Sequence, residues 1–162
     1  MKTSESTGRG GPRREGLTAP DRKLPPRLAL LMLLTRALAA WTVLAVLAVG
    51  NGALRQFVLA PLLGQSAALP ASGAVLCLVI LPFAWLAHPR LNLTGAADAW
   101  RVGACWLSLT LVFEFAFGRW VADRSWAELL AAYDLSGGNL WTLVVLVIGC
   151  APYLAGRLRR AW

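Results

Sequence analysis

The sequence predicts an all-α fold: a polytopic transmembrane bundle of four helices, with a short interfacial helix between the third and the fourth. Of its 162 residues, 57% are hydrophobic and only 15% are charged, whereas soluble domains carry ~25% charged residues. Apolar residues gather in four runs, and the first three each reach the ~20 residues that a helix needs to cross the hydrocarbon core. Lipid offers no partner to an unpaired backbone group, so these runs are expected to be helices.

The first 27 residues differ from the rest of the chain. They are rich in Ser, Gly, Pro and charge, with seven Lys or Arg and three Asp or Glu. A segment with so little apolar surface to bury cannot offset the entropy lost on ordering. We therefore expect residues 1–27 to be a disordered basic tail in the cytoplasm, followed by a four-helix transmembrane domain over residues 28–160.

The first predicted span covers approximately residues 38–59, and its start is the least defined boundary. The short apolar run 28–34 precedes it, and Arg36 separates the two. Residues 28–34 either extend the helix or lie in the membrane interface. A cleaved signal peptide is the alternative, because Ala37 and Ala39 have the small-x-small spacing of a cleavage site. The apolar run resumes directly afterwards, which favours insertion without cleavage.

The remaining spans cover approximately residues 66–87, 100–121 and 140–156, the last being the shortest. Between the third and fourth, Ser125 and Glu128 have the spacing of a capping box, which predicts a helix over residues 126–133. One face of that helix carries Trp126, Leu129, Leu130 and Tyr133. We expect it to lie on the outer membrane surface, with Gly137-Gly138 turning the chain back into the bilayer.

Basic residues are distributed unequally over the two sides of the predicted bundle. Thirteen of the sixteen Lys and Arg fall on the side of the N-terminus, and the other three are Arg55, Arg119 and Arg124. Since Lys and Arg accumulate on the cytoplasmic side, both termini are predicted to be cytoplasmic. Clustered basic residues also attract anionic lipid headgroups. No nucleic-acid-binding motif accompanies them, so we expect the lipid bilayer, and no nucleic acid, as the partner.

Three cysteines, Cys77, Cys105 and Cys150, each lie within an apolar run. A thiolate metal site between helices is disfavoured, because the chain has no C-x-x-C pair and its only histidine, His88, lies at the end of a run. We interpret the cysteines as small packing residues and predict no metal and no cofactor. No nucleophile or acid–base set stands out either, so an enzyme acting on lipid or quinone is the least favoured class.

Glu114 is the most unusual residue, because it places a carboxylate between two phenylalanines inside the third span. A charge at such depth is costly unless it is paired, protonated or in contact with water. Arg55 lies ~26 Å along the first span and Glu114 ~21 Å along the third, at ~1.5 Å per residue. The two charges therefore reach similar depths, which predicts a partly buried ion pair near the outer leaflet.

Other polar residues complete the predicted site. Asn51 lies one helical turn before Arg55 and Thr110 one turn before Glu114, so both are expected to add hydrogen bonds to the pair. Arg119 is a second possible partner for Glu114. The pair either fixes the register of the first and third helices or exchanges protons and contacts a substrate.

Three short motifs carry a resemblance. They are Asn51-Gly52-x-x-Arg55, Phe113-Glu114-Phe115-x-x-Gly118, and Trp126 followed by Tyr133-Asp134. In this combination, over approximately residues 37–156, the chain resembles a group of short four-helix bacterial inner-membrane proteins. The resemblance implies the same four-helix architecture and draws attention to Arg55 and Glu114, but it implies no reaction.

Two functions remain open. We expect foremost a non-enzymatic accessory or interaction protein of the bacterial inner membrane, whose helices pack against a second copy or another membrane protein. The alternative is a small transporter or channel subunit that uses the Arg55–Glu114 pair. Single acidic residues are weak indicators of transport, because transporters generally contain more intramembrane polarity and more helix breaks.

Overall fold

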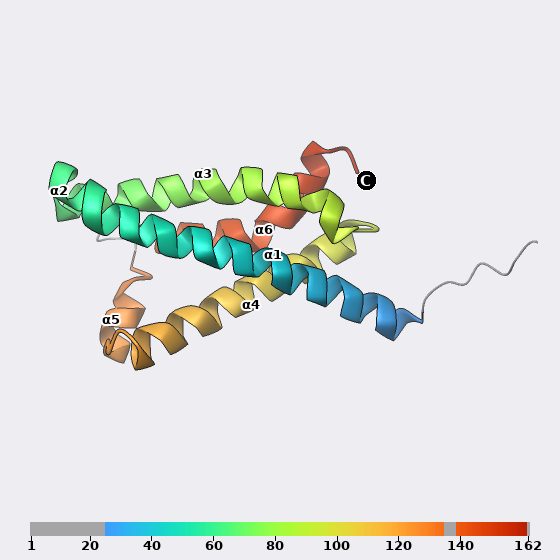
Figure 1. Ribbon diagram of the computed structural model, residues 1–162, viewed down its shortest axis with the longest axis horizontal. Coiled ribbons are helices and arrows are strands. Elements are labelled where there is room, and N and C mark those ends of the chain that lie inside the picture. Colours follow the sequence, from blue (N-terminus) through green and yellow to red (C-terminus); the bar gives the residue numbers. More distant parts are fainter. Residues whose placement is uncertain (1–24, 135–138, 162) are drawn as a thin grey trace, which may run out of the picture.

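The computed structural model describes residues 25–134 and 139–161, and this part of the chain consists of helices and short connections, with no strand (Figure 1). In chain order the elements are α1 (Pro26–Leu54), the π-helix η1 (Arg55–Leu59), α2 (Ala60–Leu63), α3 (Gln65–Leu91), α4 (Ala96–Trp120), α5 (Trp126–Ala131) and α6 (Trp141–Leu158). Four helical segments in these residues are long and apolar enough to cross a membrane. The predicted all-α bundle of a multi-pass membrane protein is confirmed.

The first span is longer than the sequence indicated. Helices α1, η1 and α2 form one continuous segment, Pro26–Leu63, of 38 residues. At ~1.5 Å per residue this is ~57 Å, well beyond the ~30 Å hydrocarbon core, so the segment extends past the membrane interior. Residues 28–34 therefore extend the helix, which begins inside the segment assigned to the tail. The rest of that tail, residues 1–24, lies outside the described residues.

The π-helix marks a widened turn near the end of this segment. The backbone N–H of Ala60 bonds to the carbonyl of Arg55, five residues earlier. The next residue, Pro61, has no N–H to donate, so the regular ladder is interrupted at the same place. Gly64, with φ 77°, ends α2 and leads directly into α3, a conformation that suits glycine. Single π turns occur frequently at functional sites.

Helix α6 lies at the centre of the bundle, where it packs against α3 and α4, and α1 packs against the same two helices. The largest fully buried side chains are Trp106, Ile80, Leu91, Val102, Val144 and Pro152. The indole N–H of Trp106 donates to the carbonyl of Ala37 at 2.9 Å, which ties α4 to α1. Gly103 allows α4 and α6 to cross closely, because a Cβ there would clash with the carbonyl oxygen of Gly149.

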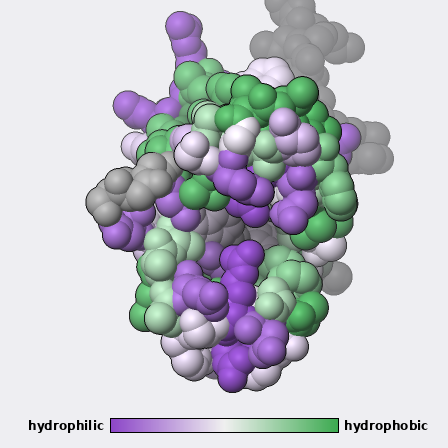
Figure 2. Space-filling model, turned by 90° about the vertical axis from the view of Figure 1, so that its left-hand side faces the viewer, coloured by the Kyte–Doolittle hydropathy of each residue, from purple (hydrophilic) through white to green (hydrophobic). Residues whose placement is uncertain are grey.

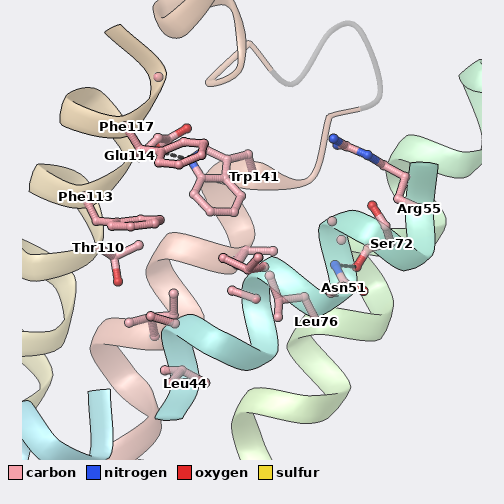
Figure 3. Close-up of a pocket in the computed structure, with 18 of the residues that line it drawn as sticks. Leu44, Asn51, Arg55, Ser72, Leu76, Thr110, Phe113, Glu114, Phe117 and Trp141 are labelled. Carbon is pink, nitrogen blue, oxygen red and sulfur yellow. Dashed lines mark hydrogen bonds between the residues drawn. The ribbon is translucent and has the colours of Figure 1, made fainter. Parts of the chain in front are cut away.

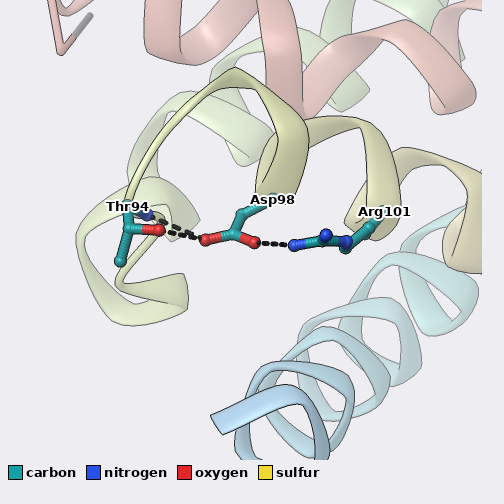
Figure 4. A network of polar contacts seen from close by, with 3 residues as sticks. All are labelled: Thr94, Asp98 and Arg101. Carbon is teal, nitrogen blue, oxygen red and sulfur yellow. Dashed lines mark hydrogen bonds and ion pairs between the residues drawn. The ribbon is translucent and has the colours of Figure 1, made fainter. Parts of the chain in front are cut away.

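A polar network joins α3 to α4 (Figure 4). Asn92, in the left-handed conformation, ends α3. The backbone N–H and the hydroxyl of Thr94 donate to one carboxylate oxygen of Asp98 at 3.2 and 2.5 Å, and Arg101 donates to the other at 2.6 Å. These bonds fix the start of α4, where a carboxylate also meets the positive end of the helix dipole.

Helix α5 lies with α2 at the end of the bundle opposite the C-terminus (Figure 1). The predicted capping box is confirmed, since Ser125 and Glu128 bond reciprocally, and the helix ends at Ala131, two residues before the predicted boundary. Leu129 is buried, and its side chain packs against α4 at Gly118. Leu130 and Trp126, on the same predicted face, are 61% and 56% exposed, so that face is only partly packed against the bundle. The predicted turn at Gly137-Gly138 lies outside the described residues.

Candidate functional site

A pocket of about 290 Å³ lies inside the bundle near the α2 and α5 end. Residues of α1, η1, α3, α4, α5 and α6 line it. Figure 2 views the molecule from this end and shows hydrophilic residues gathered around a hollow. Four of the five predicted site residues, Asn51, Arg55, Thr110 and Glu114, line this one pocket. The fifth, Arg119, is not part of its lining.

Glu114 lies on the pocket wall formed by α4. Its Oε2 accepts two hydrogen bonds of 2.5 Å, from the hydroxyl of Tyr133 and from the indole N–H of Trp141. Trp141 begins α6, so this carboxylate connects α4 with α6 and with the end of the α5 segment (Figure 3). Its second oxygen has no hydrogen bond within the described residues, and it is not among the fully buried unpaired atoms. That oxygen remains open to a ligand.

The predicted ion pair between Arg55 and Glu114 is absent. Neither ion pair that the structure describes involves them, and Figure 3 shows Trp141 between the two side chains. The predicted depths carried no information on the rotation of the helices. Helix α6 enters the bundle here and supplies an indole donor to Glu114, while Arg55 lies on the opposite wall. The guanidinium therefore lines the pocket without a protein partner among the described residues.

Asn51 and Thr110 have partners other than those predicted. The amide of Asn51 donates to the carbonyl of Ser72 on α3 at 3.1 Å, and its carbonyl oxygen is buried without a partner in the described residues. The hydroxyl of Thr110 accepts from the indole N–H of Trp41 at 3.0 Å. These bonds tie α1 to α3 and α4, so the two side chains stabilise the pocket walls.

The arginine near Glu114 is Arg124, whereas the sequence had indicated Arg119 as the second possible partner. Arg119 pairs at 3.3 Å with Asp123, one turn away on the surface, so it does not contact Glu114. Arg124, on the connection to α5, lines the pocket and is the cation whose charge acts on Glu114. Arg124 lay outside the predicted site because it follows the third span.

The Tyr133 hydroxyl is protonated and acts as a hydrogen-bond donor. Burial and the hydrogen bond to Glu114 both raise the pKa of its hydroxyl above the ordinary value of 10.0. Its ring stacks on Phe115, with centroids 6.0 Å apart and planes 2° apart. Tyr133 is therefore a fixed donor to the carboxylate. The sequence named Tyr133 as the last residue of the predicted surface helix and as part of the Tyr133-Asp134 motif, but gave no sign that it bonds to Glu114.

The deeper part of the pocket is apolar. Its lining there includes Leu44, Leu76, Ile80, Val144 and Ile148. Aromatic rings flank the polar end, where Trp41 contacts Phe113 edge-on, with centroids 6.1 Å apart. The pocket thus joins a polar end, with two guanidiniums and a carboxylate, to a hydrocarbon-like interior. Such a lining can bind a molecule that has a polar head and an apolar body.

Metal binding has no evident location in this part of the chain. Among the described residues, no group of three or more His, Cys, Asp or Glu could hold a metal ion. Cys77, Cys105 and Cys150 are free and partly buried. Comparisons of the chain with models of known families, with curated proteins and with solved structures found no match. The resemblance to short bacterial inner-membrane proteins stays a prediction.

Proposed function

We propose that the protein is a non-enzymatic accessory protein of the bacterial inner membrane that binds an amphipathic small molecule in the pocket lined by Arg55 and Glu114. The observation that carries this proposal is the combination in one cavity of an apolar interior, a carboxylate oxygen without a hydrogen bond and two guanidiniums without a salt bridge among the described residues. Its volume of about 290 Å³ is near the lower end of the ~300–1,000 Å³ typical of ligand sites. A single-chain molecule fits better than a two-chain lipid.

Selectivity in this pocket must come from the polar head. Each buried CH₂ group contributes ~0.8 kcal/mol relative to water, but a chain that leaves the bilayer interior gives up an equally apolar surrounding. The apolar lining therefore admits the body of the ligand without distinguishing it from lipid. Arg55, Arg124 and the open oxygen of Glu114 supply donors and an acceptor that lipid tails lack. The charge of these groups favours a head with an anionic group.

We further propose that both termini are cytoplasmic, so that the pocket opens toward the outer side of the membrane. Support comes from the thirteen Lys and Arg on the side of the termini against three on the other. The helices α2 and α5, near which the pocket lies, are at the opposite end. A ligand is then taken from the outer leaflet or from the space beyond it.

Two glycines of α1 provide a matched test of ligand binding. Gly52 lines the pocket and Gly50 does not, and a Cβ at either position meets no atom within 4 Å. Gly52→Leu therefore adds a side chain to the pocket lining, and Gly50→Leu adds the same side chain at a position outside the lining. We expect one small molecule per protein, identified by mass spectrometry of protein purified in nanodiscs, for the wild type and Gly50→Leu.

The Gly52→Leu variant should lose at least nine-tenths of that molecule while its helical circular dichroism is unchanged. Equal retention by the two leucine variants, or no copurified molecule in the wild type, would contradict ligand binding in this pocket. A stoichiometric membrane protein found in the same preparation would identify the partner that an accessory protein serves.

Transport is the second candidate function. The observation that favours it is the widened π turn at Arg55, which interrupts a spanning helix beside the pocket, as broken helices do in transporters. A transporter predicts that the copurified molecule, once identified, moves across proteoliposome membranes. Glu114→Gln should abolish that movement while assembly persists. If the molecule binds to the protein but never crosses the membrane, transport is refuted and the accessory role is supported.

A further inference from the structure

A second groove lies on the outside of the bundle, between α1 and α3. It measures about 440 Å³ and is separate from the pocket described above. Its lining consists of Arg36, Ala39, Ala40, Val43, Phe83, Leu86, Ala87, Arg90 and Leu91. It lies toward the end of the bundle where α1 begins and α3 ends, the same end as the C-terminus (Figure 1). The groove therefore faces lipid near one membrane boundary.

Two arginines and no acidic residue line this groove. Within the described residues, neither Arg36 nor Arg90 has a side-chain hydrogen bond or an ion pair. Other arginines at this end do have partners, since Arg101 pairs with Asp98, and Arg159 lies 4.0 Å over the ring of Trp85 and donates to its carbonyl. Two guanidiniums that share one groove repel each other, and an anion between them removes that repulsion.

Apart from the two arginines, the residues that line the groove are apolar. Small side chains, Ala39 and Ala40 on α1 and the buried Ala87 on α3, line it together with Val43 and Phe83, and all five are apolar. A hydrocarbon chain and an anion are thus accommodated next to each other. In a bilayer the molecule that joins these two groups at the depth of an interface is an anionic phospholipid.

We propose that this groove is a binding site for an anionic phospholipid, with the guanidiniums of Arg36 and Arg90 on the phosphate and one acyl chain along the alanine-lined floor. Guanidinium groups suit this role because they bind phosphate oxygens through two parallel hydrogen bonds. The inference does not depend on the proposed pocket ligand or on which side of the membrane the groove faces.

The test compares two double variants that remove the same charge. Arg36→Gln/Arg90→Gln removes both groove arginines, whereas Arg157→Gln/Arg160→Gln removes two exposed arginines at the same end that do not line the groove. Binding of phosphatidylglycerol to the full chain in a maltoside detergent is measured by native mass spectrometry. We expect the groove variant to bind at least 10-fold more weakly than the wild type, and the control variant to change less than twofold.

Two further arms define the ligand. Phosphatidylcholine, which has the same chains and no net charge, should bind at least 10-fold more weakly than phosphatidylglycerol, and glycerol phosphate alone should not compete. Equal losses in both double variants would refute the site, because general positive charge would then explain the binding. Competition by glycerol phosphate would refute a lipid in favour of a free phosphate. Matching circular dichroism and thermal unfolding of the two variants exclude misfolding as the cause.

Discussion

Gly103 and Gly149 meet where α4 crosses α6, and alanine at each position in turn tests that crossing. A Cβ added to Gly103 clashes with the carbonyl oxygen of Gly149, a backbone atom that cannot rotate away. A Cβ added to Gly149 meets only Leu107, at 3.8 Å, which is ordinary van der Waals contact. The same substitution is therefore expected to destabilise the protein on one side of the contact and to have little effect on the other.

The atoms that an added Cβ meets also determine how much each substitution lowers the free energy of unfolding. Gly103→Ala forces α4 and α6 apart along the most extensive helix contact, and overpacking of this kind costs ~1–3 kcal/mol. Gly118→Ala meets the flexible end of the Leu129 side chain, which can move, so the cost is expected at the lower end, ~1 kcal/mol. Gly149→Ala should change the free energy of unfolding by less than ~0.5 kcal/mol, as substitutions outside tight contacts generally do.

The assay is reversible unfolding in mixed micelles with increasing dodecyl sulfate, followed by circular dichroism and by the summed fluorescence of the eight tryptophans, which include Trp106. That indole is fully buried in the wild type and donates to α1, so it reports separation of the helices. Equal destabilisation by Gly103→Ala and Gly149→Ala, or a neutral Gly103→Ala, would refute the close crossing of α4 and α6.

Two further predictions concern the end of the bundle where α2 and α5 lie. Tyr133→Phe removes one of the two donors to Glu114 and should cost ~0.6–1.7 kcal/mol of unfolding free energy, the range for hydrogen bonds in membrane proteins. The loss should vanish in a Glu114→Leu background, which has no acceptor, because both residues act through this bond. The backbone N–H and hydroxyl of Ser125 hold the pKa of Glu128 below its ordinary 4.5. The cap therefore stabilises α5 above pH 4.5, and that stabilisation is lost as the pH falls through the lower folded pKa. The protection factors of the α5 amides, in which the intrinsic pH dependence of exchange is divided out, should fall below pH 4.5 in the wild type, and Ser125→Ala should remove this pH dependence.

The site was predictable in part, for a specific reason. Hydropathy and the rise of a helix place Glu114 and Arg55 at similar depths, because both quantities depend only on position along the chain. Whether two such residues touch depends on how each helix is rotated and on what lies between them. Here Trp141 of α6 occupies the intervening space, and its indole replaces the expected guanidinium as the partner of Glu114. A pairing over 27 residues leaves no periodic signal in the sequence.

The sequence by itself determined the secondary-structure elements and the distribution of charge. These are four apolar helices, a short helix capped by Ser125, and basic residues concentrated on the side of the termini. These follow from composition and from contacts within a few residues, which local chemistry controls. Only the tertiary structure decided that Arg55 and Glu114 line opposite walls of a pocket, and that Arg36 and Arg90 share a groove. Both arrangements depend on helix rotation and close crossings, which arise only when the packed helices fix one another.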